Sequence, residues 1–416
     1  MSRQSLTSLQ QRTGTFDWGQ ALALDDIHGE VAIIGVGETA YSGPSQRDCK
    51  AMALEAVSAA IDDAGLTPAE VDGLMVHFAI ADQITPEDFH GYFGTSHDLW
   101  FSDQGGAMIW AATCCHTAAH ALREGRVRNV VNVFSVDWAS RRAAGQGTPG
   151  DWHAQESLKA ALELPFGWYP QPLYFATFMQ RHMHEFGTTP EQLAAVPLTF
   201  RQHAQSHAGA VMADRPMTLA DYLAQPLLVD PFRVPDCCLI SDGAAAFVMT
   251  DAATAKDRSP HPVRVEGVGL GEISGSPYIS QQGQLTATPQ AFAAPWAYAM
   301  ADVTAGDIDV IAVYDCFSGT ALMQVEDMGF CDKGEGGPFA AEGGLHFERT
   351  RHQGGIPCNT HGGLLSHAYV LGIAHVVELV RQLRGTAANQ VENARVAAYA
   401  GFTAEAASTL ILRGDH

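Results

Sequence analysis

The sequence predicts an α/β fold made of two duplicated halves, each with a mostly parallel central sheet, in a layered arrangement of helices and sheets. Two observations predict this class. Apolar, strand-like runs alternate with helix-like segments from "VAIIGVGE" onwards, and such alternation is typical of parallel sheets covered by helices on both faces. The same order of motifs then returns in the second half of the chain, which indicates an internal duplication.

The first half opens with a polar arm, residues 1–28, which we expect to be loose, and continues with the apolar strand "VAIIGVGETA". Its Gly-Val-Gly lacks the third glycine of a dinucleotide fingerprint, so a nucleotide site is disfavoured here. The amphipathic helix "CKAMALEAVSAAIDDAG" stops at a glycine and precedes a strand at 74–76. A Gly-Gly turn then opens the apolar helix "AMIWAATCCHTAAHALREG", and "VRNVVNVFSVD" forms the next strand.

The second half repeats these elements in the same order. "VRVEGVGLGE" matches the first strand, with Gly267 and Gly269 in the places of Gly35 and Gly37. "AYAMADVTAGDIDVIAVYDCFS" matches the first helix and second strand, and "GGLLSHAYVLGIAHVVELVRQLRG" matches the Gly-Gly helix. We therefore expect an N-terminal half over residues 29–255, an inserted loop region within it at about 139–235, and a C-terminal half over residues 256–416.

The composition favours a large globular enzyme. A chain of 416 residues, 46% of them hydrophobic, can bury an extensive core. Its formal net charge of −22 argues against nucleic acid, because phosphate binding needs a basic surface. The simplest interpretation of this charge is solubility; a basic partner subunit, or a local basic patch for an anionic cofactor, is the alternative.

The eight cysteines include two adjacent pairs but no C-x-x-C pattern. This predicts reduced thiols rather than a zinc ribbon or a disulfide framework. The N-terminal segment has no apolar run of signal-peptide type, and no window approaches the ~20 apolar residues that a membrane span needs. The expectation is therefore a cytoplasmic protein without a membrane span.

Three motifs give the chain a specific resemblance: "CCLISDGAAAFVMT", "YDCFSGTALMQVEDMGF" and "GGIPCNTHGGLLSHAYVLGIAHVVELVRQLRG". Together with the duplication, they resemble the thiolase superfamily, in the branch related to sterol carrier proteins, over about Val31 to Leu412. The resemblance implies a thiolase fold and carbon–carbon bond chemistry next to a CoA thioester. It also implies a nucleophilic cysteine in the first-half glycine helix, a histidine in the second-half glycine loop, and often a second cysteine near the C-terminus.

Aligned on these motifs, the chain departs from the thiolase pattern at every catalytic position. Met108 stands where the family has its nucleophilic cysteine, and Tyr369 stands where it has its histidine. Tyr314 opens the motif "YDCF", in place of the asparagine of N-E-A-F or the first histidine of H-D-C-F. The second cysteine motif reads "AAYAGFTAE", without a cysteine. An acyl-cysteine intermediate is therefore unsupported.

Two phenols suit a retro-aldol cleavage of a β-hydroxyacyl-CoA. One group removes the hydroxyl proton, the Cα–Cβ bond breaks, and the thioester enolate receives a hydrogen bond and a proton at Cα. Tyr369 is the preferred base and Tyr314 the preferred donor to the enolate, although the sequence leaves their order open.

The exchange of thiolase residues for two tyrosines resembles the lipid-transfer-like retro-aldolases of bacterial steroid and bile-acid degradation. This resemblance implies release of propionyl-CoA or acetyl-CoA from a bulky side-chain CoA ester, leaving a ketone or an aldehyde. It also implies a homodimer that binds a small OB-fold partner protein to form a heterotetramer. CoA is part of the substrate, and no other cofactor and no metal are expected. The ring system and the side-chain length stay open.

Several residues around the tyrosines are assigned supporting roles. His361 is interpreted either as orienting the thioester or as an ordinary loop histidine, whereas His367 is assigned no chemistry. Asp315 is interpreted as scaffolding of its motif. A turn that lets CoA approach the backbone is predicted from Asn359, Gly362, Gly363 and Ser366.

Two other functions compete with the lyase. The first is a cysteine-dependent thiolase or acyltransferase that uses Cys115, Cys316 or Cys358 as a displaced nucleophile. The second is a non-catalytic, acyl-CoA-binding subunit. The inserted region is rich in aromatic residues and methionine around 150–186, which favours a pocket wall combined with a dimer interface.

Overall fold

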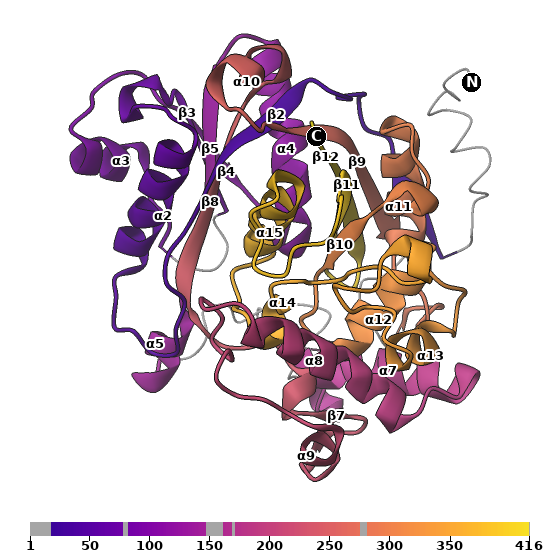
Figure 1. The fold of residues 1–416 in the computed structure, drawn as a ribbon. Helices are drawn as coiled ribbons and strands as arrows, with labels where there is room; N and C mark the ends of the chain where they lie inside the picture. Colours follow the sequence, from indigo (N-terminus) through magenta and orange to yellow (C-terminus); the bar gives the residue numbers. More distant parts are fainter. Residues whose placement is uncertain (1–17, 78–81, 147–160, 169–170, 275–280, 416) are drawn as a thin grey trace.

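The computed structural model describes residues 18–77, 82–146, 161–168, 171–274 and 281–415 (Figure 1). In these residues one large mixed sheet runs in the order β10-β11-β12-β9-β2-β8-β5-β3-β4, with β1 paired to β9. The N-terminal half supplies the strands β2 (Val31–Glu38), β3 (Gly73–His77), β4 (Trp100–Gln104), β5 (Asn129–Asp137) and β8 (Asp242–Asp251). The C-terminal half supplies β9 (Val263–Ile273), β10 (Val310–Val313), β11 (Val396–Phe402) and β12 (Ala406–Gly414).

Strand directions confirm the predicted duplication. In the first half β2, β3, β4 and β5 share one direction, and β8 runs antiparallel to its neighbours β2 and β5. In the second half β9, β10 and β11 share one direction, and β12 runs antiparallel to its neighbours β9 and β11. Each half is thus mostly parallel with one reversed strand at the same place in its order. The halves meet where β2 pairs with β9, at Ala32 and Arg264.

Helices form alternating layers with the two halves of the sheet (Figure 1). The helix α2 (Cys49–Asp63) covers one face of the N-terminal strands, and α11 (Gln290–Met300) covers one face of the C-terminal strands. Two helices, α4 (Trp110–Arg123) and α15 (Ile373–Arg384), contact strands of both halves and lie between them. The layered arrangement predicted from the sequence is confirmed.

The Gly-Val-Gly of each half serves packing between helix and strand. A Cβ atom added at Gly37 would lie 2.2 Å from the carbonyl oxygen of Ala56 in α2. A Cβ atom added at Gly269 would lie 2.0 Å from the carbonyl oxygen of Ala293 in α11. Only glycine permits this approach, so the repeated motif marks the contact of the first helix of each half with its sheet.

The predicted loop insertion is largely helical where it is described. It contains α5 (Trp138–Ala143), η3 (Leu164–Phe166), α7 (Gln171–Phe186), α8 (Pro190–Gln205), α9 (Leu219–Leu223), β6 (Leu227–Val229), β7 (Phe232–Arg233) and η4 (Val234–Asp236). The start of α8 has a capping box from Thr189 and a proline at its first position, which favour helix. Helices α7 and α8 pack against α12 (Ser318–Asp327), and α8 also contacts α13 (Gly336–Ala341) and α14 (Gly363–Ser366).

Of the predicted N-terminal arm, residues 1–17 lie outside the described residues, and residues 18–28 contain a short strand. Residues Gly19–Leu22 form β1, which pairs antiparallel with β9, because the edge of β9 offers unpaired backbone groups. The remaining described elements are η1 (Pro68–Glu70), α3 (Pro86–Phe93), η2 (Ala107–Ile109), α10 (Ala252–Arg258), η6 (Ala305–Asp307) and η7 (Arg351–Gln353). Among the described residues, no helix has both the length and the apolar character required to span a bilayer.

Candidate active site

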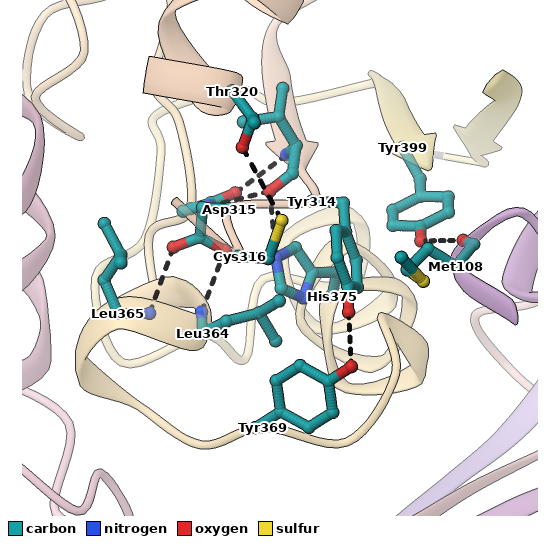
Figure 2. Close-up of polar contacts among 12 residues, drawn as sticks. Met108, Tyr314, Asp315, Cys316, Thr320, Leu364, Leu365, Tyr369, His375 and Tyr399 are labelled. Atoms are coloured by element: carbon teal, nitrogen blue, oxygen red, sulfur yellow. Dashed lines mark hydrogen bonds and ion pairs between the residues drawn. The ribbon is translucent and has the colours of Figure 1, made fainter. Parts of the chain in front are cut away.

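The two tyrosines singled out by the sequence meet in the interior (Figure 2). Tyr314 directly follows β10, and Tyr369 lies in the turn between α14 and α15. The Tyr314 hydroxyl donates a hydrogen bond to the Tyr369 hydroxyl, with 2.7 Å between the oxygens. Both side chains are buried, at 0% and 6% exposure. Burial raises the pKa of both phenols well above the usual value, and the hydrogen bond from Tyr314 opposes this rise at Tyr369.

Each tyrosine is held by contacts from distant parts of the chain. The backbone amide of Tyr314 donates to the carbonyl of Ala400 in β11 at 2.8 Å, which extends the β10–β11 pairing by one residue. The backbone amide of Tyr369 donates to the hydroxyl of Ser241 at 2.8 Å. The Tyr369 ring stacks on Trp138 of α5, with ring centroids 4.6 Å apart. Both halves and the insertion therefore build this site.

Asp315, the residue after Tyr314, accepts hydrogen bonds from the glycine loop, residues 359–369 (Figure 2). Its Oδ1 accepts from the backbone amide of Leu364 at 2.9 Å, and its Oδ2 accepts from that of Leu365 at 3.2 Å. The Nε2 atom of His375 lies 3.0 Å from Oδ1. A Cβ atom added at Gly363, whose φ is +62°, would lie 2.1 Å from Oδ2. The buried carboxylate thus holds the start of α14, and its supporting role in the reaction stays a prediction.

The residues predicted to approach CoA form one buried turn. The Asn359 side chain accepts from the amide of Val313 at 2.8 Å and donates to its carbonyl at 3.0 Å. The Ser366 hydroxyl accepts from Nε of Arg201 in α8 at 3.0 Å. Gly362, with φ of +108°, leaves no room for a Cβ atom beside Ala204. The polar groups of Asn359 and Ser366 are therefore engaged within the protein, and their contact with CoA stays a prediction.

Comparison with known proteins identifies the family of this site. A family model described as "Thiolase C-terminal domain-like" matches residues 271–414. A "Steroid side-chain-cleaving aldolase" of Thermomonospora curvata is 34% identical over 408 residues, which cover 94% of this chain and 99% of that protein. The chain belongs to the thiolase superfamily.

Two more relatives place this thiolase-superfamily protein in the same branch. A "17-hydroxy-3-oxo-4-pregnene-20-carboxyl-CoA lyase" of Mycobacterium tuberculosis is 32% identical, and the match covers 93% of this chain and 100% of that protein. A solved structure named "Ltp2-ChsH2(DUF35) aldolase" matches with a TM-score of 0.84 at 32% identity, covering 94% of this chain and 100% of that one. The resemblance to the aldolase branch is confirmed.

The sequence analysis assigns Met108 to the position of the thiolase nucleophile. Met108 is buried, and its backbone carbonyl accepts a hydrogen bond from the Tyr399 hydroxyl at 2.7 Å (Figure 2). Sequence reasoning noted "AAYAGFTAE" only for its missing cysteine and overlooked this third buried tyrosine. The signal was present, because a tyrosine stands inside the motif where thiolases have a cysteine.

The three cysteines of the thiolase alternative, Cys115, Cys316 and Cys358, are all buried. Burial raises the pKa of Cys316 and of Cys358 above the ordinary thiol value. Cys115 is fully buried inside α4, beyond its first turn, where the helix dipole has little effect on a thiol. A thiolate is the reacting form of cysteine, so these three positions disfavour covalent catalysis.

The two histidines of the glycine loop contact each other. Both are buried, and the rings of His361 and His367 meet edge to face with centroids 4.9 Å apart. Burial lowers the pKa of both rings well below the ordinary value, so both are neutral near pH 7. His361 also contacts the ring of His375 at 4.9 Å. Its predicted contact with the thioester stays a prediction.

His375, Ser241 and Trp138 are further residues that sequence reasoning missed as parts of the site. His375 lies on the first turn of α15 and its ring runs nearly parallel to that of Tyr314, at 27°. Ser241 lies in "CCLISDGAAAFVMT", a motif that indicates the family resemblance but was given no role in the site. The sequence carried no signal that these residues adjoin the tyrosines.

Proposed function

We propose that the protein is a retro-aldolase that cleaves a bulky β-hydroxyacyl-CoA, such as a steroid or bile-acid side-chain CoA ester. The products are a short acyl-CoA, propionyl-CoA or acetyl-CoA, and a ketone or an aldehyde. The observation that carries this proposal is the pair of buried phenols 2.7 Å apart, in a thiolase-superfamily site without its nucleophilic cysteine. The two relatives named as a side-chain-cleaving aldolase and a carboxyl-CoA lyase support the substrate class.

The hydrogen bond between the phenols supports a proton cycle within the pair. With one proton removed, the Tyr369 phenolate is stabilised by the hydrogen bond that Tyr314 donates. Tyr369 takes the substrate hydroxyl proton, the Cα–Cβ bond breaks, and its electron pair forms the thioester enolate while the carbonyl product is released. Tyr314 then protonates Cα, and the proton on Tyr369 passes to Tyr314, which restores the starting state.

Mass spectrometry of the products tests this function. The full chain and its partner protein are incubated with a panel of β-hydroxyacyl-CoA esters that differ in ring system and side-chain length. We expect propionyl-CoA or acetyl-CoA together with an equal amount of ketone or aldehyde. Thiolysis of a β-ketoacyl-CoA by added CoA to a shortened acyl-CoA, or turnover that iodoacetamide abolishes, would support the cysteine-dependent alternative instead.

The raised pKa of both phenols predicts how activity depends on pH. Burial favours the neutral pair, and the proposed base exists only after one proton has left. The active fraction therefore grows as the pH rises towards the apparent pKa of the pair. We expect log kcat/KM to increase by about one unit per pH unit across the neutral range. A profile that is flat or falls with pH over this range would contradict a phenolate base.

Partners are part of the proposal. The solved relative named "Ltp2-ChsH2(DUF35) aldolase" supports a second subunit, and we propose that this subunit is a small OB-fold protein. A homodimer is supported by β4, which ends the described sheet and has only β3 as its neighbour. An exposed edge strand is a template for pairing with a second copy. We propose a heterotetramer of two copies of each chain, with acyl-CoA as substrate and no additional cofactor.

A charged residue introduced on β4, the end strand of the described sheet, is expected to dissociate the homodimer. Phe101 lies on β4 and is 39% exposed. Phe101→Lys places an ammonium group on this strand, which opposes pairing between copies. Sedimentation velocity should show a monomer for this variant and a dimer for the wild type. Leu228→Lys, at a 56% exposed site on β6, is the control and should leave the dimer intact.

A further inference from the structure

Six buried polar atoms without a protein partner belong to four residues of the glycine loop and of α15. They are both ring nitrogens of His361, both ring nitrogens of His367, Nδ1 of His375 and Oε2 of Glu378. All four residues are at most 2% exposed. Buried polar groups normally have hydrogen-bond partners, so a cluster of this size points to small polar molecules between the side chains.

Four imidazole rings make a continuous series through this cluster. His207 follows α8 and is partly exposed, and its ring lies 4.7 Å from that of His367. His367 lies 4.9 Å from His361, which in turn lies 4.9 Å from His375. The His375 ring faces that of Tyr314 at a centroid distance of 6.5 Å. The series thus leads from a partly exposed residue to the proposed catalytic pair.

The chemistry of the lining suits proton transfer and disfavours metal binding. A neutral imidazole offers one donor and one acceptor, so it can receive a proton on one nitrogen and release one from the other. Burial keeps His361 and His367 neutral near pH 7. Within the described residues, no group of three or more histidine, cysteine, aspartate or glutamate side chains is arranged to hold a metal ion. Water is the partner that supplies both a donor and an acceptor.

The proposed mechanism requires a path by which one proton can leave the tyrosine pair. A neutral phenol pair contains no base. The Tyr314 side chain has no exposed surface and Tyr369 has only 6%, so the pair has little direct contact with solvent through which a proton could leave. The cleavage itself returns its proton within the pair. Only the ionisation that prepares the pair requires exchange with solvent.

We propose that His207, His367, His361 and His375 line a water-filled proton route between the protein surface and the tyrosine pair. This inference rests on the proposed function. In the outward direction a phenol O–H bond breaks, the proton passes along water and imidazole nitrogens, and bulk water accepts it beyond His207. The electron pair stays on the phenolate. The inward direction is the reverse of these steps.

The route is tested by hydrogen exchange at Cα of the short acyl-CoA product. In D2O the phenolate removes a proton from Cα of propionyl-CoA, the proton leaves by the route, and a deuteron returns to form the C–D bond. Mass spectrometry of the acyl-CoA measures this exchange, and cleavage of the β-hydroxyacyl-CoA is measured separately. Both assays use the complex with the partner protein.

His367→Phe and His207→Phe keep a ring but remove its nitrogens. We expect each variant to lower the exchange rate at least tenfold, whereas cleavage falls less than threefold, because cleavage recycles its proton inside the pair. His346→Phe is the matched control, since His346 adjoins His203 and not the series, and it should change neither rate. His367→Ala leaves space for free imidazole, whose addition should restore exchange.

The outcomes separate the route from the lyase function. Equal losses of exchange and cleavage in the phenylalanine variants would show that the histidines only shape the loop, and would overturn the route. Exchange unchanged in both variants, or no exchange by the wild type, would overturn it as well. Loss of exchange in the variants, with no cleavage of any hydroxyacyl-CoA by the wild type, would support the route and reject the retro-aldolase.

Discussion

Tyr369→Phe is expected to lower kcat for cleavage of the β-hydroxyacyl-CoA by about 10³-fold, because a general acid–base group contributes about 10²–10⁴-fold. The phenyl ring keeps the stack on Trp138 and the backbone contact with Ser241. Only the oxygen that accepts from Tyr314 is lost. KM should change little, since the ring that shapes the pocket remains. Single-turnover kinetics of the complex, followed by mass spectrometry, measures the effect.

A second buried tyrosine controls for loss of a hydroxyl group as such. The Tyr298 hydroxyl donates to the carbonyl of Met328 at 3.0 Å, away from the site. Tyr298→Phe is expected to lose about 1 kcal/mol of stability and to keep kcat. If Tyr369→Phe retained turnover within a factor of three of the wild type, Tyr369 could not be the base, and the proton cycle of the pair would have to be abandoned.

The fold was predictable because its signals are local and repeated. Alternation of strand and helix and the two Gly-Val-Gly segments are visible along the chain, and each Gly-Val-Gly marks the same helix–strand contact. The reversed strands β8 and β12 were not predictable. Their direction depends on which neighbours they pair with across the sheet, and periodicity of the sequence carries no information about that choice.

Residues of the candidate site that lie in family motifs could be predicted from the sequence. Residues that join the site only through the tertiary fold could not. Tyr314, Tyr369 and Asp315 lie in motifs that align with the family, and the structure brings the first two within hydrogen-bonding distance. Trp138 and Ser241 come from segments far from these motifs in the sequence. Their contacts with Tyr369 arise only when the insertion and β8 pack against the second half.

His361 shows that the direction of a side chain in a turn is not predictable from sequence. From the sequence, a histidine beside the glycines of this loop is interpreted either as orienting the thioester or as an ordinary loop histidine. In the structure its ring is directed into a group of other imidazoles, and both of its nitrogens lack a protein partner. The direction of a side chain at a turn depends on backbone angles, here a φ of +108° at the next residue, Gly362. Spacing in the sequence does not determine that direction.

Asp315→Ala is expected to lower the free energy of unfolding by about 3–5 kcal/mol, the cost of removing one partner of a buried charged network. The carboxylate accepts from the amides of Leu364 and Leu365 and contacts His375. All of these groups are buried, so water cannot easily replace the lost acceptor. Urea denaturation followed by fluorescence should show a lower midpoint with an unchanged slope.

Asp309, which is half-buried, is the control for Asp315. The Oδ2 atom of Asp309 accepts from the amides of Arg395 and Val396 at 2.8 and 2.9 Å, near the surface, where water can take its place. Asp309→Ala should therefore cost about 1 kcal/mol, and Asp315→Asn, which keeps one acceptor, should fall between the two alanine variants. Equal losses for Asp315→Ala and Asp309→Ala would mean that the glycine loop holds its shape without the carboxylate. The position of Tyr369 would then depend on its contacts with Ser241, Trp138 and Tyr314, without a contribution from Asp315.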